Sequence, residues 1–278
     1  MSVLHTSATL RSHDNLPLFF QQWFPEDNTS PRAHVLIVHG YAEHSGRYRD
    51  FAHHLVSEGC HVHALDLRGH GHSGGRRGHC ERFIHFLEDV EIALEQIPEN
   101  APIFLLGHSH GGLVSLDYAI SRQPAIAGLI LSNPYLGLSM EVPAAKLLVA
   151  RLAGQFLPTA AVPSGIDPSG LSHNREVVER YERDPLVFST ATTGWFVAVE
   201  QAQARVKAYR SIDLPLLYLF SDCDPIASPH DNRTLSDQLT SPDKTVVVRR
   251  GERHEILNEI NKEQTYESIT QWIRARTS

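Results

Sequence analysis

Along most of the chain, short apolar runs alternate with longer segments in which apolar residues recur at helical spacing. The continuous apolar runs predict buried strands at 34–38, 62–67, 103–106, 127–132, 214–220 and 245–248. Segments of helical spacing follow at 49–58, 82–96, 113–119, 232–239 and 262–276. Two further segments, 3–11 and 16–24, alternate around Asp14 and Asn15 and predict a β-hairpin. The pattern therefore predicts an α/β protein with a mostly parallel eight-stranded sheet covered by helices on both faces.

The alternation stops between residues 134 and 210, where prolines and glycines divide a partly helical stretch without a buried-strand run. This predicts a helical cap, 134–210, inserted into a core formed by 1–133 and 211–278. Its first helix, 144–156, is apolar over more than one face. Two interpretations stay open: a helix packed inside the cap, or an exposed lid that touches membrane surfaces transiently or admits acyl chains.

Two glycine-rich stretches directly follow predicted strands. The first, 67–75, is too rich in glycine to continue a strand or a helix, and we expect a sharp surface turn there. The second, 107–112, has the pattern Gly-x-Ser-x-Gly between a strand and a helix. In that setting the serine occupies a strained backbone position, and the glycines let strand and helix pass closely. Ser109 is thus a candidate nucleophile.

Composition is ordinary for a folded protein, with 41% hydrophobic and 21% charged residues among 278. The formal net charge of −7 argues against a nucleic-acid partner, because a polyanion requires a basic face. The short basic cluster of Arg76 and Arg77, with Arg68 nearby, lies among glycines in a predicted loop. We therefore expect no nucleic-acid binding.

The three cysteines, Cys60, Cys80 and Cys223, are widely spaced and odd in number, which fits a reducing compartment. The N-terminal residues do not form a signal-peptide pattern, and no run approaches the ~20 apolar residues of a membrane span. We expect a cytoplasmic protein. Cys223 stands beside Asp224, so it is either a thiol whose modification changes activity or an inert buried side chain.

Eighteen histidines raise the question of a metal site, particularly the pairs His61/His63 and His70/His72. A zinc site requires three or four convergent ligands, and no H-E-x-x-H motif or cysteine pair completes one. We therefore expect neither a metal nor another cofactor.

A serine hydroxyl needs a base, and the base needs an orienting carboxylate. Both occur at predicted strand ends: Asp224 follows the strand 214–220, and His254 follows the strand 245–248. Asp222 competes with Asp224, which we prefer because Pro225 fits a turn that aims its side chain at the next loop. The order Ser, Asp, His is that of α/β-hydrolases.

Two backbone N–H groups are expected to stabilise the oxyanion. One belongs to His110, directly after the nucleophile, and the other to Tyr41, in the loop after the first parallel strand. His39 precedes that loop, and we expect it to act as a structural hydrogen-bonding residue.

Four separated motifs resemble monoglyceride lipases and related lysophospholipase-like serine hydrolases. They are His39-Gly40-x-x-Glu43-His44-Ser45-Gly46-Arg47-Tyr48, Asp66-x-Arg68-Gly69-His70-Gly71-x-Ser73, Gly107-His108-Ser109-x-Gly111-Gly112 and Asn174…Tyr181-x-x-Asp184-Pro185-Leu186. The resemblance implies an α/β-hydrolase fold with an inserted cap. It also implies hydrolysis of a monoacylglycerol to glycerol and a fatty acid, without a cofactor. Ser109, Asp224 and His254 match the family's triad, and Tyr41 and His110 match its oxyanion positions.

By the same matching, Glu43, Arg47, His108 and Tyr181 fall where the family has polar groups around the glycerol end of the substrate. Structural roles are the alternative, with Glu43 and Arg47 bridging loops and Tyr181 capping a helix. The chain departs from the family at position 110, where methionine is usual. That change leaves the backbone donor intact but alters the packing, or the local response to pH, behind the nucleophile.

Other functions share this set of residues. The same site serves a lysophospholipase, a carboxylesterase, a thioesterase or an amidase, and a ligand-binding homologue keeps the pocket without catalysis. A peptidase of the proline-iminopeptidase type needs a cap carboxylate for an N-terminal amine, and the candidates are Glu141, Glu176, Glu179 and Glu182.

Overall fold

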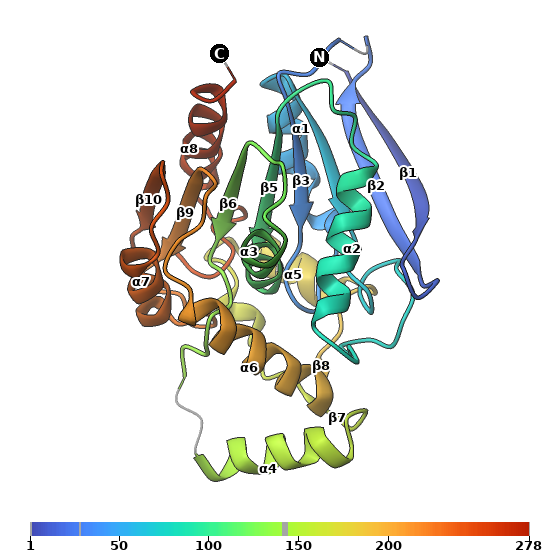
Figure 1. Cartoon of the computed structure of the whole chain (residues 1–278), viewed down its shortest axis with the longest axis vertical. Coiled ribbons are helices and arrows are strands. Elements are labelled where there is room, and N and C mark those ends of the chain that lie inside the picture. Colours follow the sequence, from blue (N-terminus) through green and yellow to red (C-terminus); the bar gives the residue numbers. More distant parts are fainter. Residues whose placement is uncertain (1, 28, 141–143, 278) are drawn as a thin grey trace.

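The computed structural model of the chain describes residues 2–27, 29–140 and 144–277. Within these residues, eight strands form one sheet in the order β1-β2-β4-β3-β5-β6-β9-β10 (Figure 1). The strands are β1 (Val3–Arg11), β2 (Pro17–Pro25), β3 (Ala33–Val38), β4 (Cys60–Leu65), β5 (Ile103–His108), β6 (Gly128–Ser132), β9 (Leu216–Ser221) and β10 (Lys244–Arg249). β2 pairs antiparallel with β1 and β4, and the other pairings are parallel. The predicted mostly parallel eight-stranded sheet is confirmed.

Helices cover both faces of the sheet, as predicted (Figure 1). They are α1 (Arg49–Ser57), α2 (Ile84–Glu95), α3 (His110–Arg122), α7 (Pro229–Gln238) and α8 (Lys262–Arg274). Successive residues of β3 point to opposite faces, because side chains alternate along a strand. Leu36 and Val38 therefore join one core cluster with α2, α3 and α7, whereas Val35 and Ile37 join a second with α1 and α8.

Between β6 and β9 the chain leaves the sheet, and we call residues 133–215 the β6–β9 insertion. It contains α4 (Ala144–Phe156), β7 (Ala161–Pro163), the short 3₁₀ helix η2 (Pro168–Gly170), α5 (Arg175–Arg183), β8 (Thr190–Thr192) and α6 (Thr193–Ala208). α6 packs on α3 and buries Trp195, Val199 and Ala202 in the core. β7 and β8 pair as a small antiparallel sheet that the sequence pattern did not indicate.

α4 lies at the outside of the insertion, where it packs on α6 (Figure 1). Its apolar side chains point largely into solvent: Val149 is 65% exposed and Phe156 is 75% exposed, and Leu148 and Leu152 are also exposed. Of the two interpretations, the helix packed inside a cap core is wrong for these residues. No helix in the described ranges is long and apolar enough to cross a membrane.

The glycine-rich loop after β4 differs from the expected surface turn, because all of residues 66–71 are buried. The carboxylate of Asp66 accepts hydrogen bonds from the N–H groups of Ser45 and His72 (2.8 and 2.7 Å). Gly71 has a positive φ of 48°, and a Cβ there would collide with the carboxylate of Asp66. The glycines thus let the backbone fold closely around a buried carboxylate, which local composition did not indicate.

Candidate active site

Ser109 occupies the predicted strained turn between β5 and α3. Its φ of 52° and ψ of −117° place a non-glycine residue in a conformation that costs roughly 1–3 kcal/mol. A Cβ on Gly111 would collide with the carbonyls of Val38 and His39, so glycine is required where α3 passes β3. The N–H of Ser109 donates to the carbonyl of Ser132 at the end of β6 (3.0 Å). The turn is therefore held against its neighbouring strands with the serine side chain at the sheet's carboxyl edge.

Ser109, His254 and Asp224 come together at this edge, although 145 residues separate the first two. The hydroxyl of Ser109 lies 2.8 Å from Nε2 of His254, and Nδ1 of His254 lies 2.7 Å from Oδ2 of Asp224. The other oxygen of Asp224 accepts from the N–H groups of Ile226 and Ala227 (2.8 and 3.0 Å). The carboxylate is thus fixed, and it favours the tautomer in which Nδ1–H donates and Nε2 accepts.

Asp222, the competing carboxylate, points elsewhere. It is exposed, and its Oδ1 accepts from the N–H of Gly251 (2.8 Å). The structure therefore places Asp224, as preferred from the sequence, beside His254.

The surroundings of His254 raise its pKa above the ordinary value of 6.5. Burial by itself lowers the pKa of this imidazole, but the charge and hydrogen bond of Asp224 outweigh it. His254 is therefore a stronger base than a free histidine, and the proton that it accepts is stabilised by the carboxylate.

The backbone segments that carry the two predicted oxyanion donors lie close to Ser109. α3 begins at His110, and its first backbone hydrogen bond runs from the N–H of Leu113 to the carbonyl of Ser109 (3.0 Å). The N–H of His110 precedes this ladder, so no helical carbonyl accepts it. Tyr41 follows β3, and the preceding Gly40 approaches so closely that a Cβ on it would lie 3.2 Å from the Cβ of Ser109. Both backbone segments are thus near the nucleophile.

Glu43 and Arg47 belong to a buried ionic network. The carboxylate of Glu43 accepts from the N–H of Gly40 (2.6 Å), the hydroxyl of Tyr48 (2.8 Å) and the guanidinium of Arg47 (2.6 Å). Arg47 also binds both carboxylate oxygens of Glu255, next to His254, at 2.6 and 2.8 Å. Burial raises the pKa of Glu43, but Arg47 reverses this effect and lowers it to about 2. Arg47 therefore joins the loop after β3 to the loop that carries His254.

Tyr181 joins the same network from the β6–β9 insertion. Its buried ring lies under the guanidinium of Arg47, 4.9 Å from the ring centre, which is a cation–π contact. Nearby, Nε2 of His44 lies 2.9 Å from the carboxylate of Asp184, just after α5. The motif in the insertion thus contacts the motif after β3, which lies 140 residues earlier in the chain.

His108 and His110 are buried on either side of Ser109 in the sequence. The ring of His108 lies 4.9 Å from that of His254, and its Nδ1 is 3.1 Å from the carbonyl and hydroxyl oxygens of Ser132. Burial and the neighbouring His254 lower the pKa of His108 to about 4. It is therefore neutral near pH 7 and packs beside the base.

The imidazole of His110 is wholly buried, and neither ring nitrogen has a hydrogen-bond partner among the described residues. Burial lowers the pKa of His110 to about 3. Five rings lie near it, those of Tyr41, His70, Phe83, Phe86 and Trp195. This apolar setting suits methionine, the residue usual in the family that the sequence resembles, better than it suits histidine.

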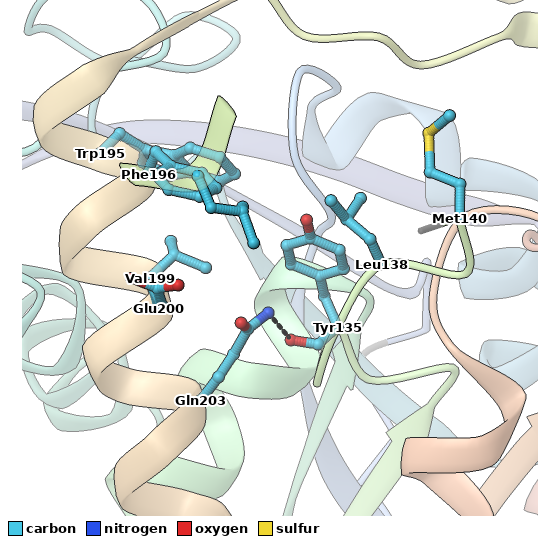
Figure 2. Close-up of a pocket in the computed structure, with 9 residues that line it drawn as sticks. Tyr135, Leu138, Met140, Trp195, Phe196, Val199, Glu200 and Gln203 are labelled. Atoms are coloured by element: carbon cyan, nitrogen blue, oxygen red, sulfur yellow. Dashed lines mark hydrogen bonds between the residues drawn. The ribbon is translucent and has the colours of Figure 1, made fainter. Parts of the chain in front are cut away.

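A pocket of about 180 Å³ lies between α6 and the chain that follows β6, and its lining residues are drawn in Figure 2. The residues that line it are mainly apolar: Tyr135, Leu138, Met140, Leu147, Trp195, Phe196, Val199, Glu200 and Gln203. The N–H of Tyr135 donates to the carbonyl of Ser109 (2.9 Å), so one wall of the pocket adjoins the nucleophile. Gln203 fixes that wall by donating to the carbonyl of Tyr135 (2.9 Å).

Several other sequence candidates lie apart from the triad. On α5, Glu176 and Glu182 are exposed, and Glu179 pairs with Arg175 (3.0 Å); Glu141 lies outside the described residues. Cys223 is exposed, whereas Cys60 and Cys80 are buried. Within the described ranges, no three His, Cys, Asp or Glu side chains form a group that could hold a metal ion.

One buried residue of this edge, Asn133, was not among the sequence candidates. It follows β6 directly, and its side chain binds both His254 and Ser221. The available signal was its position, because a polar residue immediately after a buried parallel strand lies at the edge where sites form.

A mostly parallel eight-stranded sheet, a strained serine between strand and helix, and Asp and His on the loops after β9 and β10 define an α/β-hydrolase. Residues 29–261 match the family described as Serine aminopeptidase, S33. The chain belongs to this family.

Its relatives include lipases. A monoacylglycerol lipase of Mycolicibacterium smegmatis is 32% identical over 262 residues, which cover 92% of this chain and 92% of that protein. Phospholipase YtpA of Bacillus subtilis is 30% identical over 244 residues, covering 86% and 93%. The crystal structure of Paleococcus ferrophilus monoacylglycerol lipase matches with a TM-score of 0.82 at 30% identity, covering 99% of this chain and 100% of that one. The chain spans 29% of a longer abhydrolase domain-containing protein of Dictyostelium discoideum, to which it is 31% identical over 274 residues.

Proposed function

We propose that this protein is a serine hydrolase that cleaves monoacylglycerol to glycerol and a free fatty acid. The observation that carries the proposal is the continuous line of hydrogen bonds from Asp224 through His254 to the hydroxyl of Ser109 (2.7 and 2.8 Å). The resemblance to monoacylglycerol lipases over nearly the whole chain supports the substrate class.

The reaction has two steps. His254 takes the proton of Ser109 as its oxygen attacks the ester carbonyl, and the N–H groups of Tyr41 and His110 bind the oxyanion. His254 then returns the proton to the leaving glycerol, which leaves an acyl-enzyme. Water, activated by His254, hydrolyses that ester and releases the fatty acid. No cofactor takes part.

The two ends of the substrate have different surroundings in this proposal. The acyl chain enters the apolar pocket that begins at Tyr135, where each buried CH₂ contributes about 0.8 kcal/mol. The glycerol end lies toward Glu43, Arg47, His108 and Tyr181. These four residues also make hydrogen bonds and ring contacts within the protein, as a purely structural role predicts. Turnover of substrate analogues separates glycerol binding from that structural role.

Residues 134–210 act as the cap in this proposal, and exposed side chains of α4 contact the lipid surface transiently. The cysteines fit a reducing compartment, so the expected location is the cytoplasm with peripheral membrane contact. Replacing Leu152 and Phe156 by serine should reduce co-sedimentation with phosphatidylcholine vesicles that contain monoacylglycerol. Leu4→Ser is the control, because Leu4 is also exposed but lies on β1, far from α4 (Figure 1). Equal binding by the α4 variant and the control would argue against this contact.

Assays of several substrates with one purified sample determine which reaction the protein catalyses. We expect turnover of monoacylglycerol to exceed that of lysophosphatidylcholine and acyl-CoA, and Ser109→Ala to abolish it. Phospholipase YtpA among the relatives favours lysophospholipase activity as the second candidate, which faster turnover of lysophosphatidylcholine would support.

Two further controls address the remaining alternatives. A fluorophosphonate should label the native protein but not Ser109→Ala; absence of labelling would indicate a ligand-binding homologue. Turnover of a prolyl anilide in preference to the lipid esters would instead indicate a peptidase.

A further inference from the structure

Asn133 connects the ends of the three strands, β5, β9 and β10, that carry the triad. Its N–H donates to the carbonyl of Leu219 in β9 (2.9 Å), and its Oδ1 accepts from the N–H of Ser221 (2.7 Å). Its Nδ2 donates to the backbone carbonyl of His254 (2.5 Å). The preceding carbonyl, that of Ser132, accepts the N–H of Ser109 (3.0 Å). The backbone of residues 132 and 133 thus contacts the nucleophile turn and β9, and the side chain of Asn133 joins the end of β9 to the loop that follows β10.

Ser221 extends this connection to the loops on either side. Its hydroxyl donates to the carbonyl of Glu252, two residues before His254, and accepts from the N–H of Cys223 (3.0 Å), which precedes Asp224. The loops that carry the carboxylate and the imidazole are therefore bound to each other through Asn133 and Ser221, away from the reacting atoms.

Asparagine meets two independent requirements at this position. Its partners are a backbone N–H and a backbone carbonyl, so the side chain must offer one acceptor and one donor, which an amide does. The backbone φ is 43°, a left-handed conformation that asparagine adopts more readily than most residues. The side chain is wholly buried, so both hydrogen bonds are formed away from bulk water.

We propose that Asn133 is a positioning residue that fixes the imidazole of His254 relative to the hydroxyl of Ser109. This inference rests on the proposed function of the triad. Asn133 does not touch the reacting atoms; it acts through the main chain of His254. A misplacement of about 1 Å at a catalytic group reduces turnover about 10²-fold, so loss of this anchor should act mainly on kcat.

Two substitutions test the proposal. Asn133→Asp keeps the acceptor for Ser221 but places a carboxylate oxygen against the carbonyl of His254. Asn133→Gly keeps the left-handed backbone and removes both side-chain bonds. Asn15→Asp and Asn15→Gly are matched controls, because Asn15 also has a positive φ (66°) but lies in the turn between β1 and β2.

Kinetics are measured with p-nitrophenyl butyrate, and kcat is calculated per site titrated by a fluorophosphonate, so that unfolded protein does not contribute. We expect both Asn133 variants to lose about 10- to 100-fold in kcat, with KM changed less than about twofold. Asn133→Asp should also move the acid limb of the pH profile to higher pH, because an additional buried carboxylate stabilises the imidazolium. The Asn15 variants should match the wild type.

A purely structural role for Asn133 predicts a lower melting temperature with unchanged kcat per titrated site and an unchanged pH profile, and that result would overturn the inference. If Asn133→Asp fails to fold, the kcat of Asn133→Gly decides. Ser109→Ala is measured alongside. If this variant kept the turnover of the wild type, the proposed function itself would be refuted. An inactive Ser109→Ala together with unaffected Asn133 variants would refute only the role of Asn133.

Discussion

His110→Met should stabilise the protein without removing its activity. The imidazole of His110 buries one donor and one acceptor that have no partner among the described residues. An unsatisfied buried polar group costs about 1–3 kcal/mol, and a methionine thioether requires no such partner. We therefore expect the free energy of unfolding to rise by about 1–3 kcal/mol near neutral pH.

The gain in the free energy of unfolding should be larger at acidic pH. Burial lowers the pKa of His110 from 6.5 to about 3 in the folded protein, so below 6.5 the unfolded chain binds a proton that the folded chain does not. Stability is therefore lost as pH falls from 6.5 toward 3, and linkage gives a loss of about 2 kcal/mol at about pH 5 for this group. Methionine does not titrate, so the advantage of His110→Met should reach about 3–5 kcal/mol there.

Urea unfolding of the wild type and His110→Met at about pH 8 and pH 5 measures both the gain in stability near neutral pH and its increase in acid. His53→Met is the control, because His53 is exposed on α1. Turnover should persist, since the proposed oxyanion donor at position 110 is the backbone N–H. Equal stability of wild type and His110→Met, or a gain that does not change with pH, would refute this reasoning.

Three further predictions concern the site. Turnover of a soluble ester should fall with decreasing pH through a pKa above 6.5, because His254 acts as a base only when neutral and its pKa is raised; a pH–rate profile measures this. Arg47→Met should lower the free energy of unfolding by about 3–5 kcal/mol in urea, because Glu43 and Glu255 lose their buried countercharge. Full alkylation of the native protein should reduce turnover through the exposed Cys223, and Cys223→Ser should resist it.

Each of these has a clear contrary result. An acid limb below 6.5 would show that the measured step does not depend on His254 as described. A loss under about 1 kcal/mol in Arg47→Met would indicate that water screens the two glutamates. Unchanged turnover after full alkylation would assign Cys223 an inert role.

The sequence alone determined the elements and the chemistry that lies within them. Side-chain periodicity is a local property, so the strands around β3, β5 and β9 and the helix 144–156 were predicted close to their observed bounds. The strained turn at Ser109 was also predictable, because its glycines and its strand-to-helix setting are contiguous in the chain. Chain order then indicated which loops would carry the acid and the base.

Tertiary structure alone decided which side chains meet. Asp222 and Asp224 lie two residues apart in one loop, and the sequence favoured Asp224 only through the turn expected at Pro225; the folded path of the loop directs Asp224 to His254 and Asp222 to Gly251. The exposure of α4 and the burial of residues 66–71 depend on what packs against them, which local pattern does not record. Asn133 reaches His254 across 121 residues. Such contacts form because separate strands end at one edge of the sheet, and their pairing is a property of the folded chain rather than of any segment.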